Sequence, residues 1–209
     1  MKPRKIVLIG AGGHAQACID VIESEGNYEI EGLVGTRDEV GKFINGYKVI
    51  GCDQDLAELS KDFKCAVIAI GQIQSPELRI KAFERAVELG FKMATIISPT
   101  AYVSTRANVG AGTIIMHGAI VNCGARIGAN CIINSRALIE HGSVISDHCH
   151  ISTGAIINGE VSIGKGSFIG SGAVIRERVA LGNFSLVGMA NRVLENLSEK
   201  NYSDGKVSP

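Results

Sequence analysis

Aliphatic side chains return at every sixth position of the chain from Ile97 to Val187, sixteen times without an insertion. The fourth residue after each of the first fifteen is small or slender, as at Ala101, Cys131 and Ser167. A period of six fits neither a helix nor a long strand, but it fits a short strand followed by a tight turn. Three such units would close a triangular coil, and stacked coils would bury their aliphatic residues. The pattern therefore predicts an all-β hexapeptide-repeat solenoid over about residues 96–190.

Glycine often follows the aliphatic residue directly, as at Gly110, Gly128 and Gly164. Glycine has no Cβ and adopts backbone angles that are strained for other residues. We therefore expect these glycines to supply unusual backbone angles in the turns.

The first 95 residues carry a different pattern, in which apolar runs alternate with helical stretches. Strands are predicted at residues 5–9, 30–34, 65–70 and 93–97. One helix is expected to end near Gly26, and another to run from Pro76 to Gly90. Such alternation is typical of a parallel sheet covered by helices, here a small α/β, Rossmann-like domain. We expect this domain at residues 1–95, the solenoid domain at 96–195 and a frayed polar tail at 196–209.

A glycine-rich turn, Gly10-Ala11-Gly12-Gly13-His14-Ala15, joins the first strand to the first helix and fits the pattern G-x-G-x-x-G/A. Its backbone N–H groups and the helix N-terminus can hold a phosphate. The acidic residue that a dinucleotide fold has after the second strand is replaced by Val34-Gly35-Thr36. A phosphate or nucleotide-sugar site is favoured, and ligand-free packing of strand on helix and an NAD site are the alternatives.

Composition narrows the possible partners and location. The chain has 209 residues with 21 Lys and Arg against 21 Asp and Glu, so no basic excess indicates nucleic-acid binding. No apolar run approaches the length of a membrane span, and the run after the basic N-terminus is too short for a signal peptide. The six cysteines form no C-x-x-C pair. We expect a cytoplasmic protein without nucleic-acid or membrane partners.

Four histidines interrupt the solenoid pattern, and they are His117, His141, His148 and His150. An 18-residue coil would stack His141 over Cys123 and under Gly159. We expect His117 and His148 to be solvated turn residues. The repeats alone leave the role of His141 open.

Two segments carry a family resemblance in addition to the unbroken hexads. They are Ile9 to Ala15 at the glycine turn, and Asn134 to Gly142 followed by His150-Ile151-Ser152 in the solenoid. With these segments in this order, the chain resembles the bacterial sugar acyltransferases of the NeuD/PglD type over roughly residues 4–195. The resemblance implies a left-handed parallel β-helix after the Rossmann-like domain, and a homotrimer with its active sites between neighbouring subunits.

The resemblance also implies roles for single residues. His141 matches the general base. The glycine turn, comprising Gly10, Gly12, Gly13 and His14, matches the site for the nucleotide part of a sugar substrate. Asn134, His150 and Gly159 match positions that line the acetyl-CoA and acceptor site, with the Gly159 N–H facing the thioester carbonyl. Acetyl-CoA would be a co-substrate, and no metal is implied.

Three positions depart from the family pattern. Gly142 stands where the family often has an acidic residue, so a carboxylate that orients His141 would come from elsewhere, for example from Glu140. Gly35-Thr36 replaces the acidic pair often found after the second strand, and Gly188 to Arg192 replaces a closing Gly-x-Pro-Ala-Lys. The string Ile-Glu-His-Gly is more similar to the sialic-acid O-acetyltransferase branch than to the bacillosamine N-acetyltransferase branch.

We therefore expect an acetyl-CoA-dependent acetyltransferase that acts on a sugar precursor of a bacterial surface glycan. The acceptor, an amine of a nucleotide-linked amino sugar or a hydroxyl of sialic or a related nonulosonic acid, is open at this point. One alternative is a non-catalytic, nucleotide-sugar-binding trimeric scaffold. Another is a metalloenzyme like γ-carbonic anhydrase, although the spacings between the solenoid histidines do not match its ligand pattern.

Overall fold

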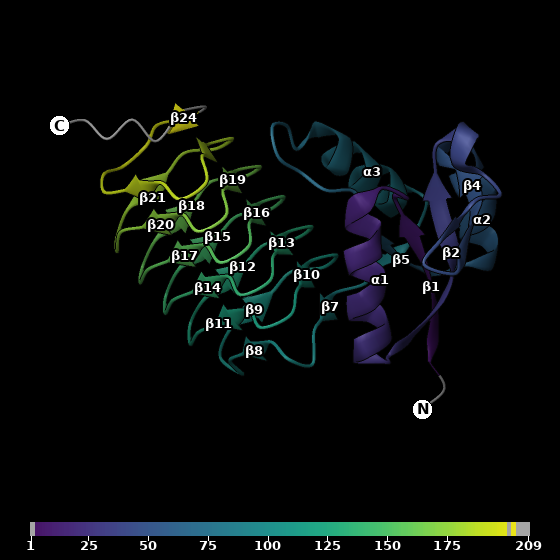
Figure 1. Ribbon diagram of the computed structural model, residues 1–209, viewed down its shortest axis with the longest axis horizontal. Coiled ribbons are helices and arrows are strands. Elements are labelled where there is room, and N and C mark those ends of the chain that lie inside the picture. Colours follow the sequence, from purple (N-terminus) through teal and green to yellow (C-terminus); the bar gives the residue numbers. More distant parts are fainter. Residues whose placement is uncertain (1–2, 200–201, 204–209) are drawn as a thin grey trace. The chain divides into compact units, whose positions relative to one another are not determined.

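A computed structural model describes residues 3–199 and 202–203, which form two compact units (Figure 1). The first unit extends to Gly71 and resumes over Glu77–Ile97. The second comprises Gln72–Pro76 and the described residues from Ser98 onward. The short segment Gln72–Pro76, between a strand and a helix of the first unit, thus packs with the solenoid, which the sequence did not indicate.

The first unit is built on a six-stranded sheet in the order β3-β4-β2-β1-β5-β6. All its neighbouring strands are parallel except β3 and β4. Its strands, and β7 at the end of the unit, are β1 (Arg4–Ile9), β2 (Tyr28–Gly35), β3 (Phe43–Ile44), β4 (Tyr47–Cys52), β5 (Cys65–Ile68), β6 (Lys92–Met93) and β7 (Ile96–Ile97). The central strands bury an apolar run each, Ile6 to Ile9 in β1 and Cys65 to Ile68 in β5, as expected of strands covered on both faces.

Three helices accompany this sheet, α1 (Gly13–Glu25), α2 (Leu56–Asp62) and α3 (Glu77–Glu88), with short 3₁₀ turns at Arg37–Glu39 (η1) and Asp53–Asp55 (η2). Helix α1 ends at Gly26, whose φ of 72° is left-handed and whose N–H donates to Ile22. The predicted helices and the first three predicted strands of this unit occur, but the strand expected over residues 93–97 is wrong as one element, because β6 and β7 are separate and belong to different sheets. Residues 36–64, for which the sequence pattern predicts no element, contain β3, β4 and α2.

The second unit is a stack of two-residue strands separated by turns (Figure 1). Its strands from 98 to 199 are β8 (Tyr102–Val103), β9 (Asn108–Val109), β10 (Ile114–Ile115), β11 (Ile120–Val121), β12 (Arg126–Ile127), β13 (Ile132–Ile133), β14 (Leu138–Ile139), β15 (Val144–Ile145), β16 (His150–Ile151), β17 (Ile156–Ile157), β18 (Ser162–Ile163), β19 (Phe168–Ile169), β20 (Val174–Ile175), β21 (Ala180–Leu181), β22 (Leu186–Val187) and β23 (Arg192–Val193). Each pairs in parallel with the strand 18 residues away, as β11 does with β14, which gives three sheets. The expected triangular coil is therefore present.

The position of a residue in the six-residue repeat decides whether its side chain is buried. The second residue of each strand is the aliphatic position of the repeat, and from Ile115 onward every one of them is buried. The small residues four positions later are buried from Thr113 onward and form columns at the corners. At these corners thiols and hydroxyls bond to main-chain carbonyls, as the Cys131 Sγ does to the carbonyl of Ser146 at 3.2 Å. Small polar side chains are thus tolerated inside because the corners offer them acceptors.

The left-handed backbone lies at a different hexad position from the one expected. Fourteen successive positions from 112 to 190, each three residues after the aliphatic one, have φ between 53° and 73°. Half are glycine, and the others are Asn130, Arg136, His148, Glu160, Arg178, Phe184 and Ala190. The glycines directly after the aliphatic residue do not have positive φ. A Cβ at Gly110 would lie 2.5 Å from the Gly128 backbone of the next coil, so the close approach of coils requires glycine there.

The expectation of a frayed tail is wrong for its first residues. The Leu197 N–H donates to the carbonyl of Ala180 at 3.0 Å, and its carbonyl accepts from Gly182 at 2.8 Å. Asn196 caps the main chain of Ala180 through its side chain. Beyond them, β24 (Tyr202–Ser203) pairs with β22. Residues 200–201 and 204–209 of the predicted tail lie outside the described part.

Candidate active site

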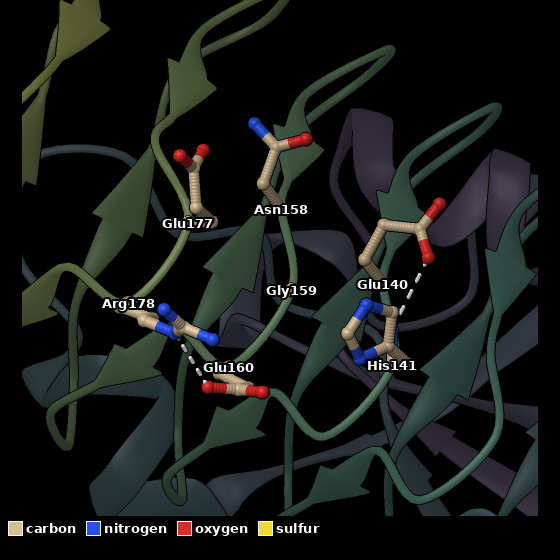
Figure 2. A pocket seen from close by; sticks show the side chains of 7 residues that line it. All are labelled: Glu140, His141, Asn158, Gly159, Glu160, Glu177 and Arg178. Atoms are coloured by element: carbon tan, nitrogen blue, oxygen red, sulfur yellow. Dashed lines mark hydrogen bonds and ion pairs between the residues drawn. The ribbon is translucent and has the colours of Figure 1, made fainter.

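A cleft of about 530 Å³ opens at one corner of the solenoid (Figure 2). It is lined by Glu140, His141, Asn158, Gly159, Glu160, Glu177 and Arg178. His141, Gly159 and Glu177 each occupy the second position after the aliphatic residue of their hexad, following β14, β17 and β20. The regular stacking of one sheet therefore aligns the imidazole with the two turns of the coils that follow.

The stacking predicted for His141 is confirmed. The Gly142 N–H donates to the carbonyl of Cys123 at 3.2 Å, and the Glu160 N–H donates to the carbonyl of His141 at 3.0 Å. The main chain at His141 is thus held from both neighbouring coils, while the side chain is exposed in the cleft. Gly142, which replaces the expected acidic residue, has a φ of 69°. A glycine adopts this conformation without strain.

Gly159 lies directly against the imidazole. A Cβ built at Gly159 would be 2.7 Å from both Cε1 and Nε2 of His141, closer than real Cβ contacts come. The ring occupies the space that any other residue at position 159 would need. The structure therefore brings together two of the predicted site residues, His141 and Gly159.

Three carboxylates and one guanidinium surround this pair (Figure 2). The Glu140 Oε2 accepts from the main-chain N–H of His141 at 3.2 Å and from the Asn122 side chain at 3.0 Å. Glu140 thus holds the backbone that carries the imidazole. Glu160 forms an ion pair with Arg178 at 2.8 Å, which lowers the pKa of the Glu160 carboxyl. The charge of His141, when present, lowers that pKa further, so Glu160 is within electrostatic reach of the ring.

Asn134 and His150 form a second cluster, and neither lines the cleft. The Asn134 amide nitrogen lies 3.2 Å from His150 Nε2, and His150 Nδ1 lies 2.5 Å from the carbonyl of Gln72. The His150 side chain is 6% exposed and its ring meets Phe168 edge-on. Gln72 is not predictable from the sequence, because nothing local indicates that its segment folds back on the solenoid.

The other two solenoid histidines are not simply solvated. His148 is buried, has a φ of 60° and contacts the Asn130 amide through Nδ1 at 2.9 Å, so the expectation of a solvated residue is wrong. His117 is half-buried, with Nδ1 2.7 Å from the Ser98 hydroxyl. Neither lines the cleft. Cys123, one coil from His141, is exposed.

In the first unit, the glycine turn lies between β1 and α1. Gly10 is required by the fold, because its φ is 125° and a Cβ would lie 2.8 Å from the backbone of Ala69. Gly12 and Gly13 are exposed at the start of α1, and a Cβ at either would meet nothing within 4 Å. Packing therefore explains Gly10 but not Gly12 or Gly13, which leave the helix N-terminus open. His14 is half-buried, one residue further along.

An acidic side chain does lie at the end of β2, although it comes from a later residue. The Glu39 carboxylate accepts from the N–H and the hydroxyl of Thr36, at 2.7 and 3.0 Å, and these bonds lower its pKa. A Cβ at Gly35 would lie 2.6 Å from this carboxylate and 3.0 Å from the Cβ of Ala11 in the glycine turn. The spacing Thr-x-x-Glu of a capping box was the signal that could have located it.

A buried arginine fixes the end of β5. Arg79 of α3 is 1% exposed, and its Nη1 donates to the carbonyls of Ile68 and Ile70 at 2.7 and 2.8 Å. The charge–dipole bonds hold the main chain where it leaves the sheet for Gly71. This role of Arg79 is not predictable from the sequence, since a lone arginine in a helix normally faces solvent.

The described residues contain no group of three or more His, Cys, Asp or Glu side chains placed to hold a metal ion. Within the same part of the chain, no helix has both the length and the apolar character to cross a membrane.

Two family models match the sequence. The PglD N-terminal domain matches residues 5–86, and the bacterial transferase hexapeptide model, six repeats long, matches residues 142–177. The second match begins directly after His141. A comparison with curated proteins finds no significant match.

Several solved structures are similar over nearly the whole chain. PerB from Caulobacter crescentus, in complex with CoA and GDP-perosamine, has a TM-score of 0.89 and 29% identity over 95% of this chain and 92% of its own. The acetyltransferase domain of PglB from Neisseria gonorrhoeae, in complex with acetyl coenzyme A, has a TM-score of 0.88 and 30% identity over 96% and 95%. WeeI from Acinetobacter baumannii has the same fold, with a TM-score of 0.84 and 21% identity over 95% of each chain.

These likenesses agree with the expected architecture, a Rossmann-like α/β domain followed by a left-handed parallel β-helix. They extend through both units, from the glycine turn to the His141 cleft. The chain belongs to the PglD-type family of hexapeptide-repeat sugar acyltransferases.

Proposed function

We propose that the protein transfers the acetyl group of acetyl-CoA to the amine of a nucleotide-linked amino sugar. The observation that carries this proposal is the pairing of His141 with Gly159 in the solenoid cleft, where the imidazole fills the space that a Cβ at position 159 would take. Support comes also from the similar PglB domain with acetyl coenzyme A, and from PerB with CoA and GDP-perosamine.

In this proposal His141 is the general base of a direct transfer. The amine nitrogen attacks the thioester carbonyl carbon, a C–N bond forms, and the C–S bond breaks to release coenzyme A as its thiol. The neutral imidazole takes the proton that the nitrogen loses as it bonds to carbon, and the imidazolium then gives this proton to the leaving sulfur. Glu140 holds the main chain beneath the ring, and Glu160 lines the same cleft in its ion pair with Arg178. The Gly159 N–H stabilises the oxyanion of the tetrahedral intermediate.

The charges around His141 favour an amine over a sialic acid as acceptor. Glu140, Glu160 and Glu177 line the cleft against the single cation Arg178, which is already paired with Glu160. An acidic cleft attracts an amino sugar, which is partly cationic near neutral pH, and repels the carboxylate of a nonulosonic acid. These charges are a stronger indication of the acceptor than the similarity of the Ile-Glu-His-Gly string to the O-acetyltransferase branch.

The glycine turn is proposed to hold the nucleotide part of the sugar substrate. Gly12 and Gly13 leave the start of α1 uncovered in the first unit, where backbone N–H groups attract phosphate. Glu39 places a hydrogen-bond acceptor beside the same turn, which suits the hydroxyl groups of a ribose. His14 remains a candidate contact.

We further propose that the active protein is a homotrimer. The first residues of β8, β11, β14, β17 and β20 form an apolar column, Tyr102, Ile120, Leu138, Ile156 and Val174, on the sheet whose turns carry the cleft. Tyr102 is 58% exposed and Ile120 41%. A second copy packed on this column would lie next to His141, and it could complete the site with its own Asn134 and His150.

The test is an acetyl-transfer assay on the purified chain with acetyl-CoA and a panel of acceptors. The panel contains UDP- and GDP-linked amino sugars, CMP-linked and free sialic acid, and buffer alone. Coenzyme A and acetylated product are measured by chromatography, because the exposed Cys123 would react with a thiol dye. We expect product with a nucleotide-linked amino sugar. Product with sialic acid alone would contradict the amine proposal, and no product with any acceptor would favour the binding scaffold.

The role of His141 is tested by His141→Asn in the same assay. We expect a folded protein whose turnover falls by about 10²–10⁴, the usual contribution of a general base. His117→Asn is the matched control, since His117 has the same hexad position on another corner and does not line the cleft. Turnover of His141→Asn equal to that of the control would remove the assignment.

A further inference from the structure

Gln72, His150 and Asn134 are joined by a chain of hydrogen bonds in the second unit. His150 Nδ1 lies 2.5 Å from the main-chain oxygen of Gln72, and Nε2 lies 3.2 Å from the Asn134 amide nitrogen. The Ser135 N–H donates to the Asn134 side-chain oxygen at 2.7 Å. The side chains of Gln72 and His150 are 3% and 6% exposed, so water has little access to either contact.

The direction of each bond follows from the two main-chain groups at its ends. A carbonyl oxygen can only accept, so the Nδ1 that faces Gln72 carries a hydrogen. A main-chain N–H can only donate, so the Asn134 atom facing Ser135 is its oxygen, and the atom facing His150 is its NH₂ group. The NH₂ group donates to Nε2, which must therefore be unprotonated.

We infer that Gln72 is a positioning residue, whose main-chain carbonyl holds His150 as the neutral imidazole with its hydrogen on Nδ1 and its lone pair on Nε2. This goes beyond the proposed function, which assigns His150 to the ligand site without saying whether it donates or accepts. On that proposed function rests one consequence. His150 Nε2 has no hydrogen to donate to a thioester carbonyl, and it accepts from a ligand N–H or O–H group when that group takes the place of the Asn134 amide.

The side chain of Gln72 anchors this arrangement to the solenoid. Its Nε2 approaches the main-chain oxygens of Gly166 and Ser167 at 3.3 and 3.4 Å. Pro76, at the end of the same segment, lies near Gly166. Phe168 meets the His150 ring edge-on at a centroid distance of 5.2 Å, so the ring is fixed by packing as well as by its hydrogen bonds.

The tautomer is measured by long-range ¹H–¹⁵N correlation NMR on the full chain with ¹⁵N-labelled histidine and no ligand. The His150 signals are identified by their loss in His150→Gln. We expect a single neutral form with the hydrogen on Nδ1 at neutral pH. A hydrogen on Nε2, or both tautomers in exchange, would overturn the inference.

Asn134→Asp tests the direction of the bonds. A carboxylate cannot donate to Nε2, so the ring must gain a second hydrogen, and we expect the His150 signals to take the imidazolium pattern at the same pH. Asn183→Asp is the control, because Asn183 is exposed and accepts from the Lys165 N–H, a bond that aspartate keeps. A neutral His150 in Asn134→Asp would contradict the assigned directions.

Gln72→Ala tests the anchor, with Gln74→Ala as control on the same segment, where the side chain is exposed. We expect the first variant to show both tautomers and the second to keep one. A single Nδ1–H tautomer in Gln72→Ala would refute the role of the side chain. Because these spectra need no substrate, they test the role of Gln72 even if the protein has no acetyltransferase activity.

Coenzyme A then tests the consequence for the ligand site. Added to the labelled wild type, it should shift the Nε2 signal of His150 while Nδ1 keeps its hydrogen. Transfer of the hydrogen from Nδ1 to Nε2 on binding would overturn the acceptor assignment. Absence of any shift would count against a ligand contact of His150, and hence against that part of the proposed function alone.

Discussion

At the scale of single residues, the cleft depends on the absence of one atom. Gly159 leaves room for the imidazole because it has no Cβ, and the ring has no such constraint on its exposed side. An added methyl group would meet the end of a movable side chain and not a fixed backbone. It should therefore move His141 and leave the coil intact.

Gly159→Ala is expected to lower turnover by about 10²-fold, because a displacement of roughly 1 Å misaligns a base with its proton. Steady-state kinetics and thermal unfolding of the variant measure the two effects separately. Lys165→Ala, at the same hexad position of another corner, is the matched control. Wild-type turnover in Gly159→Ala would contradict the ring contact. An unfolded variant would instead show that glycine is needed by the coil.

Glu39 gives the first unit a stability that depends on pH. The bonds from Thr36 lower the pKa of its carboxyl, so the folded state binds this proton more weakly than the unfolded state does. The contribution is therefore complete above the unfolded pKa of 4.5, and it is lost as the pH falls through the lower folded value.

Glu39→Gln should reduce the free energy of unfolding at pH 7 by about 0.5–1 kcal/mol, a small value for a cap because the carboxylate is exposed. Urea unfolding at pH 7 and pH 3 checks this, and the difference from wild type should shrink at the lower pH. Glu84→Gln, an exposed residue of α3, should match wild type at both pH values. An equal loss at both would mean that the charge has no part in the cap.

At the scale of elements, each hexad from Val109 to Val187 holds one left-handed residue, and glycine fills half of these positions. The other half accept the strain of a side chain in this conformation, including Glu160 and Arg178 of the cleft. In the cleft, the strained position is thus the one that supplies the ion pair beside His141.

Gly154→Ala isolates this strain, since a Cβ at Gly154 meets nothing within 4 Å and its φ is 65°. We expect a loss of about 1–2 kcal/mol in the free energy of unfolding, the usual difference between alanine and glycine in the left-handed region. Denaturant unfolding measures it. Arg136→Gly, at an equivalent exposed position, should not destabilise the protein. A neutral Gly154→Ala would show that the turns relax around a side chain.

The sequence predicts the solenoid well because its signal is periodic and each hexad repeats the same local chemistry. The strand positions, the buried columns and the stacking of His141 between Cys123 and Gly159 all follow from the period of six. What it does not predict depends on contacts between distant residues. Gln72 meets His150 across 78 residues, and Glu39 reaches Gly35 through a turn that no repeat marks.

At the scale of the whole molecule, the column from Tyr102 to Val174 is the feature that a single chain leaves unexplained. Exposed apolar residues in a row on one sheet are typical of surfaces that bind another protein. In the sheet of β9, β12, β15, β18 and β21, the corresponding first residues are Asn108, Arg126, Val144, Ser162 and Ala180, of which three are polar. This contrast between two sheets of the solenoid supports the proposal that a second copy of the chain packs on the sheet with the apolar column.

Ile120→Lys should convert a trimer into monomers, because it places a charge in the apolar contact. Sedimentation velocity or light scattering measures the mass in solution. Ser162→Lys places the same charge at the same hexad position on the polar sheet, and it should remain trimeric. A wild type that sediments as a monomer would contradict the proposed assembly, and so would a trimeric Ile120→Lys.

The eighteen-residue register of the parallel strands also limits how the protein can change in length. Removing or inserting one full coil of 18 residues would keep every later strand in its own sheet, so the solenoid would only become shorter or longer. A cut of six residues would instead turn all that follows by a third of a revolution. If the cut lies between His141 and Glu177, the turn that carries Glu177 and Arg178 would move to a different corner of the solenoid from the imidazole, although each coil would still be well formed.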